Sequence, residues 1–411
     1  MDRYDLLYDL YESFDTDGLR DHQRFVDVFP PVDSRVALEQ YQAIDTELDR
    51  RKGEIRDAFD HGETLCEVAA HATREEAFTA LDLLTKHGRG VNVLVLDVDE
   101  TLRSAGGTDN EIPRETLHYL TELHEEGVPI VICTGQTLEN VKGFAIQGLG
   151  SELVHSGTLS IVYEAGTGAF TPGHGTDTKK LLYERLDEGM QNVFYGLRSR
   201  VLPEAPDGIR AGCHLQGNEF NVTLKPNAET GSREARDIID RALCYLVDLL
   251  GTVVAEETDV EDGSEWARTF YAAVDPEIRG VLERRGELPK RDSAELPAAL
   301  TEVFERIDVA YYEADAAEVG SLELNKVVGV EAAFEVLGVD DPFALVMGDS
   351  KSDLRVMEWA ADGKGIAAAP DHASRAVLDH VIRTDELVFD RGEAAAILRI
   401  IYALNRLTAL D

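Results

Sequence analysis

The sequence is poor in basic residues and has no long apolar run. Its 411 residues include 40 Lys and Arg against 79 Asp and Glu, which gives a formal net charge of −39. A surface this acidic repels nucleic acid and anionic membranes, so neither is expected as a partner. No apolar run approaches the ~20 residues that span a bilayer, and the sequence opens without the pattern of a secretory signal. We therefore expect a soluble, cytoplasmic protein.

The acidic residues are spread along the whole chain, and Arg is more frequent than Lys. Self-repulsion on this scale is tolerable where salt screens it, because the Debye length falls to about 3 Å at 1 M salt. The composition favours a halophilic cytoplasm, and an acidic protein of an ordinary cytoplasm is the alternative.

Cysteine is also scarce. The four cysteines, which share no C-x-x-C spacing, are Cys66, Cys133, Cys213 and Cys244. Four thiols in a chain of this length predict reduced, mostly buried residues instead of a disulfide framework.

Residues 1–90 carry the spacing of helices. Apolar residues recur at near-helical intervals between residues 34 and 62, and Thr73 with Glu76 has the form of a capping box before a stripe that ends at Gly88. We find no chemical motif here. This stretch therefore predicts a helical N-terminal extension that serves packing or homo-oligomerisation.

From residue 91 onward, short apolar runs alternate with helical patterns. The runs, which are typical of strands buried on both faces of a parallel sheet, cover residues 91–96, 128–133, 343–347 and 365–369. The alternation predicts a doubly wound, Rossmann-like α/β core made of residues 91–155 and 325–411. Between them, residues 156–324 predict an inserted α+β cap domain. Within it, residues 220–224 and 252–255 are strand-like and residues 232–250 are helix-like.

Polar residues follow three of the predicted strands. Asp97 and Asp99, in the pattern D-x-D-x-T, come directly after the first strand, and Thr134-Gly135 follows the second. Ligands of open α/β sheets bind beyond the carboxyl ends of the strands, so both carboxylates are expected in one cleft. One carboxylate there can attack phosphorus while the other transfers protons. Close carboxylates need a cation, and Mg²⁺ suits oxygen ligands.

Two further elements complete the pattern. Lys326 opens a predicted helix, and Gly348-Asp349-Ser350-Lys351-Ser352-Asp353 follows the strand at 343–347. Asp349 and Asp353 suit a Mg²⁺ site, although this segment alone also fits an Asx-turn and a helix N-cap.

These motifs, in this order, resemble those of the haloacid dehalogenase-like (HAD) superfamily. The family's D-x-D-x-T, its Thr or Ser, its Lys and its G-D-x-x-x-D fall on residues 97–101, Thr134, Lys326 and residues 348–353. Lys326 follows Thr134 by 192 positions, which leaves room for a large lid, as in the C2-capped (type IIB), Cof-like branch.

The resemblance implies a role for each residue. Asp97 would be the nucleophile and Asp99 the general acid and base, while Thr134, Gly135 and Lys326 would bind the phosphoryl group. Mg²⁺ would be held by Asp97, the backbone carbonyl of Asp99 and Asp349, with Asp353 as a ligand or an orienting residue.

The function implied is a Mg²⁺-dependent phosphatase that acts on a small phosphorylated metabolite, in particular a sugar phosphate. Two alternatives remain open: a phosphomutase with the same aspartyl-phosphate chemistry, and a non-catalytic module that uses the fold for binding or assembly.

The acidic composition makes a first prediction. We expect the melting temperature to rise with KCl concentration and the protein to unfold at low salt, because screening relieves the repulsion among 79 carboxylates. Thermal unfolding followed by circular dichroism across a KCl series measures this. A melting temperature that is indifferent to KCl would count against haloadaptation.

Overall fold

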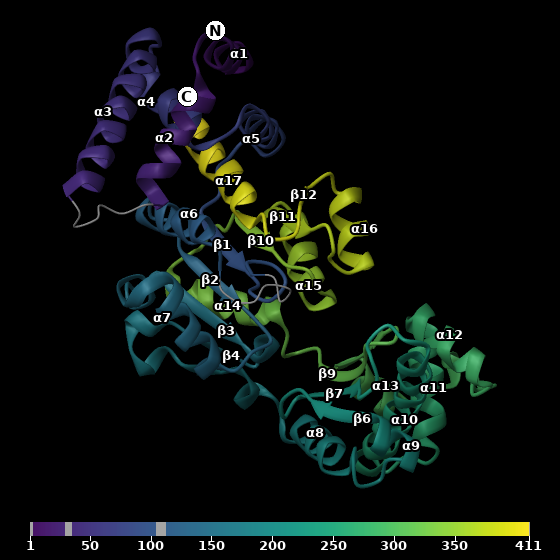
Figure 1. Ribbon diagram of the computed structural model, residues 1–411. Helices are drawn as coiled ribbons and strands as arrows, with labels where there is room; N and C mark the ends of the chain where they lie inside the picture. The colour runs from purple at the N-terminus through teal and green to yellow at the C-terminus, as the bar shows by residue number, and fades with distance from the viewer. Residues whose placement is uncertain (1–2, 29–34, 104–111, 411) are drawn as a thin grey trace. The chain divides into compact units, whose positions relative to one another are not determined.

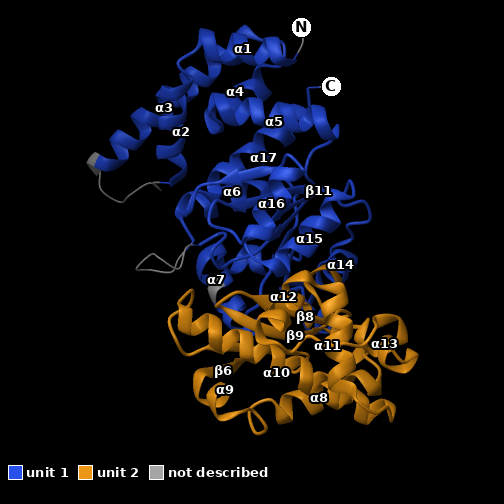
Figure 2. Ribbon diagram, turned by 90° about the vertical axis from the view of Figure 1, so that its right-hand side faces the viewer, with its two compact units in different colours: residues 1–165, 169–180, 329–411 blue, residues 166–168, 181–328 orange. Residues whose placement is uncertain are grey.

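The computed structural model describes residues 3–28, 35–103 and 112–410, in two compact units (Figure 1). Unit 1 comprises residues 1–165, 169–180 and 329–411, and unit 2 comprises residues 166–168 and 181–328 (Figure 2). Within the described ranges, no helix combines the length and apolar character that crossing a membrane requires.

Unit 1 is built on one eight-stranded sheet with the strand order β12-β11-β10-β1-β2-β3-β4-β5. The strands are β1 (Val93–Leu96), β2 (Ile130–Cys133), β3 (Leu159–Tyr163), β4 (Gly168–Phe170), β5 (Lys180–Leu181), β10 (Ala344–Met347), β11 (Gly365–Pro370) and β12 (Leu387–Phe389). The first strand, β1, pairs in parallel with β10 on one side and with β2 on the other. The chain thus winds outward from β1 in both directions, which confirms the predicted doubly wound α/β core.

Helices connect these strands. They are α6 (Arg114–Glu125), α7 (Leu138–Val154), α14 (Lys326–Leu337), α15 (Lys351–Ala361), α16 (Arg375–Arg383) and α17 (Ala394–Thr408). The first of them begins after Pro113 and is followed by Gly127, which adopts a φ of +86°. Both residues suit these positions, since proline is compatible with a helix start and glycine tolerates a left-handed conformation.

The N-terminal helices belong to unit 1. They are α1 (Arg3–Ser13), α2 (Thr16–Val28), α3 (Arg35–Ala58), α4 (Gly62–His71) and α5 (Arg74–His87). Thr73 and Glu76 form the predicted capping box of α5. Both α4 and α5 pack on α17, and their buried residues share one apolar core with the sheet. Residues 3–28 and 35–90 are therefore an integral layer of unit 1 and not a separate domain. Residues 1–2 and 29–34 of this prediction lie outside the described residues.

Unit 2 is an α+β unit with its own apolar core. Its antiparallel sheet has the order β6-β7-β9-β8, with β6 (Cys213–Gln216), β7 (Asn221–Pro226), β8 (Ile307–Tyr312) and β9 (Ala316–Ser321). Its helices are α8 (Glu188–Arg200), α9 (Asp207–Gly212), α10 (Arg233–Thr258), α11 (Gly263–Val274), α12 (Pro276–Arg285) and α13 (Ala298–Phe304). The long helix α10 packs on β7 and β9.

Two predictions made from the sequence were wrong. The predicted strand at residues 252–255 lies inside α10, because Leu246, Leu250 and Val254 are buried at helical spacing and this packing outweighs the preference of β-branched residues for strands. The predicted start of the cap at residue 156 is too early, because β3 pairs in parallel with β2 and belongs to the sheet of unit 1.

All four cysteines are unpaired and buried, as predicted. Burial raises the pKa of the Cys66 and Cys213 thiols to about 11, so both stay protonated at neutral pH.

One side chain fixes the entry of the chain into β1. Asn405 of α17 accepts a hydrogen bond from the backbone N–H of Val91 through Oδ1 at 2.8 Å, and its Nδ2 donates to the Val91 carbonyl at 2.9 Å. Val91 is buried, so water cannot readily replace these bonds. The pair joins the last helix of unit 1 to the start of its central strand.

We predict that Asn405→Ala lowers the free energy of unfolding by roughly 2–6 kcal/mol, since two buried backbone groups lose their partners at about 1–3 kcal/mol each. Chemical denaturation followed by circular dichroism measures the change. Asn140→Ala on the exposed face of α7 is the control and should have little effect. Equal stability of the two variants would contradict this role of Asn405.

Candidate active site

The strand ends place three predicted site residues at one edge of the sheet. Asp97 follows β1, Thr134 follows β2, and Asp349 lies two residues beyond β10. Leu96 is paired with Met347 of β10 and with Ile132 of β2, so these strands end at the same level. The backbone N–H of Asp97 donates to the Met347 carbonyl at 2.9 Å, which extends the ladder by one residue. This edge is where open α/β sheets bind ligands.

Three carboxylates converge there. Asp97, Asp349 and Asp353 each offer an oxygen, and these atoms lie within 4.8 Å of one another. Asp97 is 7% exposed and Asp353 is 3% exposed, so water screens their repulsion poorly. Carboxylate oxygens at this spacing fit the ligand preference of Mg²⁺, and a divalent cation would offset the repulsion.

Gly348 allows Asp353 to reach this cluster. A Cβ at position 348 would lie 2.4 Å from both Cβ and Cγ of Asp353, which is too close for any side chain other than that of glycine. The Oδ2 atom of Asp353 accepts hydrogen bonds from Ser350, at 3.0 Å from the backbone N–H and at 2.6 Å from Oγ. The bond from the Ser350 backbone N–H is part of the capping box of α15. The two interpretations of this segment, helix cap and metal site, are therefore compatible, because a carboxylate has two oxygens.

Asp99 has different neighbours. Its carboxylate is about half exposed, accepts hydrogen bonds from Arg103 at 3.0 Å (Nε) and 2.7 Å (Nη2), and accepts one from Gln136 Nε2 at 2.5 Å. Glu100 adopts a φ of +59°, and the N–H groups of Leu102 and Arg103 both donate to the Val98 carbonyl. This turn brings Arg103 back to Asp99.

Arg103 and Gln136 were not anticipated from the sequence. Their only signal is proximity to motifs: Arg103 lies four residues after Asp99, and Gln136 lies two residues after Thr134. Such spacing does not predict a contact outside a helix. Both contacts depend on the turn after Asp97 and on the neighbouring position of β2.

The remaining predicted residues differ in their setting. The Thr134 side chain is buried, its Oγ1 accepts from the Gln136 N–H at 3.1 Å, and Gly135 is exposed. Lys326 is buried and is the first residue of α14, which Asn325 caps through bonds to the Val327 and Val328 N–H groups. Because Lys326 falls in unit 2 and the carboxylates fall in unit 1, its convergence with them stays a prediction.

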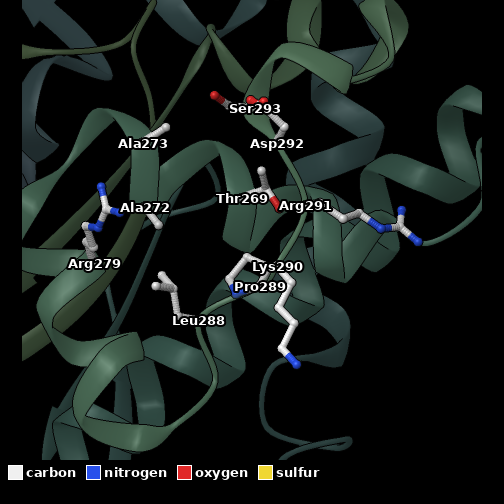
Figure 3. A pocket seen from close by; sticks show the side chains of 10 residues that line it. All are labelled: Thr269, Ala272, Ala273, Arg279, Leu288, Pro289, Lys290, Arg291, Asp292 and Ser293. Carbon is white, nitrogen blue, oxygen red and sulfur yellow. The ribbon is translucent and has the colours of Figure 1, made fainter.

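Unit 2 has a cavity of about 390 Å³ beside α11 and α12 (Figure 3). It is lined mainly by the loop at residues 288–293, together with Thr269 and Arg279. Two of its cationic side chains are paired with acids, Arg279 with Glu283 and Arg291 with Asp262. None of the predicted site residues lines this cavity.

Comparisons with known proteins agree with the motif pattern. Residues 94–163 match the family described as haloacid dehalogenase-like hydrolase. A search of the curated proteins finds no match.

Solved structures with related folds share little sequence with the chain. A putative HAD/COF-like hydrolase from Plasmodium vivax is 16% identical, with 81% of this chain and 100% of that chain covered and a TM-score of 0.43. The sucrose-phosphatase from Synechocystis sp. PCC6803, solved with sucrose and phosphate, is 13% identical and has a TM-score of 0.42. The match covers 77% of this chain and 99% of that chain. A HAD-superfamily phosphatase from Bacteroides thetaiotaomicron is 14% identical and has a TM-score of 0.41. The match covers 77% of this chain and 96% of that chain. Likenesses at these scores carry no inference about activity.

The family match covers β1, the D-x-D-x-T motif, β2 and β3, which are the elements that carry Asp97, Asp99 and Thr134. The match to the family described as haloacid dehalogenase-like hydrolase thus rests on residues 94–163.

Proposed function

We propose that this protein is a Mg²⁺-dependent phosphatase that hydrolyses a small phosphorylated metabolite through an aspartyl-phosphate on Asp97. The convergence of Asp97, Asp349 and Asp353 at the carboxyl ends of adjacent parallel strands carries the proposal. Three carboxylates this close together, two of them buried, are costly without a cation, and an oxygen-ligated cation beside a nucleophile suits phosphoryl transfer.

The proposed ligands of Mg²⁺ are Asp97, Asp349 and the backbone carbonyl of Asp99, with Asp353 as a further ligand or as an orienting residue. When bound, the ion would neutralise negative charge on the carboxylates and on the phosphoryl oxygens. The Thr134 hydroxyl, the Gly135 N–H and the Lys326 ammonium would bind the phosphoryl oxygens.

The chemistry has two steps. In the first, a carboxylate oxygen of Asp97 attacks phosphorus, the bond to the ester oxygen breaks, and Asp99 gives its proton to the leaving alkoxide. In the second, Asp99 removes a proton from water, the resulting hydroxide attacks phosphorus, and Asp97 is released together with inorganic phosphate. The hydrogen bonds from Arg103 and Gln136 would keep the Asp99 carboxylate in position for both proton transfers.

The resemblance to the C2-capped, Cof-like branch makes a sugar phosphate the substrate class of first choice. Unit 2, as the cap, would select the substrate. The net charge of −39 disfavours an anionic substrate at long range. Binding would therefore depend on local positive charge from Mg²⁺ and Lys326, which is a reason to expect both to be essential.

We predict that Asp97→Asn abolishes release of phosphate from p-nitrophenyl phosphate, because an amide cannot form the phosphoenzyme. Asp99→Asn should lower kcat by roughly 10²–10⁴, the usual contribution of a general acid and base. Steady-state assays with Mg²⁺ measure both. Asp362→Asn, at an exposed position after α15, is the matched control and should keep wild-type activity. Equal phosphate release by wild type and Asp97→Asn, or full activity in excess EDTA, would overturn the proposal.

A second prediction follows from the packing of Gly348 against Asp353. Gly348→Ala should weaken Mg²⁺ binding by about 10- to 100-fold, the usual effect of disturbing the support of a metal ligand. Isothermal titration with Mg²⁺ measures this directly. Gly143→Ala is the control, because a Cβ on this helical glycine meets no atom within 4 Å. Unchanged Mg²⁺ affinity in Gly348→Ala would exclude Asp353 from the site.

A further inference from the structure

A second cluster of potential metal ligands lies among the helices of unit 1, away from the sheet edge. Asp27 of α2, His71 of α4 and His118 of α6 each offer a ligand atom, and these atoms lie within 4.8 Å of one another. The Nε2 atom of His118 is 3.2 Å from Oδ2 of Asp27. The imidazole rings of His71 and His118 are nearly parallel, with an interplanar angle of 17° and centroids 6.4 Å apart. Three separate helices thus bring potential metal-ligand atoms, nitrogen from the histidines and oxygen from Asp27, close together.

The hydrogen bonding of this cluster is incomplete. His118 Nε2 is buried, and within the described part of the chain it makes no well-directed hydrogen bond, despite its closeness to Asp27. Gln23 is 8% exposed and donates from Nε2 to Asp27 Oδ1 at 2.6 Å, while its Oε1 is buried without a partner among the described residues. Buried polar atoms are usually satisfied, so the partnerless Oε1 of Gln23 and the poorly directed contact of His118 are two atoms that a cation beside Asp27 would satisfy.

The outer contacts resemble the support of a metal-binding histidine. His71 is 4% exposed, and its Nε2 lies 3.5 Å from Oε2 of Glu67, one turn earlier on α4. Lys52 Nζ holds both oxygens of Glu67 at 2.9 and 3.0 Å. A carboxylate on one imidazole nitrogen orients the ring and makes the other nitrogen a better ligand.

We propose that Asp27, His71 and His118 bind a transition-metal ion of the Zn²⁺ type. Two imidazoles and one carboxylate suit Zn²⁺ and disfavour Mg²⁺, which prefers oxygen ligands. The fourth position would be filled by water or by the amide oxygen of Gln23. The ion would join α2 and α4 to α6 and so fasten the N-terminal helices to the α/β core. The site is independent of the proposed phosphatase chemistry, which uses none of these residues.

The test uses the full-length protein after removal of metals with a chelator, in buffer with excess Mg²⁺. Isothermal titration with Zn²⁺ should show one tight equivalent, and Co²⁺ should give the intense visible absorption of a low-coordinate site with nitrogen ligands. The cluster at Asp97 could itself bind Zn²⁺ or Co²⁺, so both titrations are repeated with the Asp349→Asn variant. The single tight equivalent of metal should persist in that variant. Zn²⁺ should also raise the melting temperature.

His118→Ala and Asp27→Asn should each lose this equivalent, the Co²⁺ spectrum and the Zn²⁺-dependent rise in melting temperature. His61→Ala is the matched control, since His61 is an exposed histidine that precedes the same helix α4, and it should behave as wild type. The variants should still hydrolyse p-nitrophenyl phosphate, so loss of this site is distinguishable from failure of the phosphatase proposal. Wild-type protein that binds no Zn²⁺ at micromolar concentration would overturn the proposal. Unchanged binding in His118→Ala would do the same, and the cluster would then be a metal-free ion pair.

Discussion

The repulsion among three carboxylates at the edge of the sheet is the constraint around which unit 1 is arranged. Asp97, Asp349 and Asp353 bring their oxygens within 4.8 Å of one another at largely buried positions. Like charges in such a place raise the free energy of the folded protein unless a cation compensates them. The rest of the fold must therefore hold these side chains in place, and it does so through backbone elements that are themselves deeply buried.

The parallel register of β1, β2 and β10 provides most of this support. All four residues of each of these strands are buried, so a shift in register would expose apolar side chains to solvent. Gly348 and the capping box at Ser350 then set the position of Asp353 at the start of α15. A helix cap and a proposed site residue coincide here, since the oxygen that caps α15 belongs to Asp353, a carboxylate of the cluster.

The N-terminal helices extend the same apolar core. Residues on α1, α4 and α5 are buried together with α17 and the sheet, and Asn405 links α17 to the start of β1. The stability of the site and the packing of residues 1–90 are thus coupled, since α17 contacts both layers. The polar cluster of Asp27, His71 and His118 interrupts this layer, and buried polar groups of this kind carry a cost in free energy that a bound ion would remove.

The sequence alone determined the doubly wound core, because buried parallel strands are short apolar runs and the helices between them carry their own start and stop residues, such as Pro113 and Gly127. It also determined which residues stand at the strand ends, since position after a strand is a local property. Only the tertiary structure decided that Arg103 and Gln136 hold Asp99 and that residues 252–255 are helical. It also decided that β3 lies in the core sheet and that Asp27, His71 and His118 meet. The physical reason is that these features depend on contacts between segments far apart in the chain, where packing outweighs local preference.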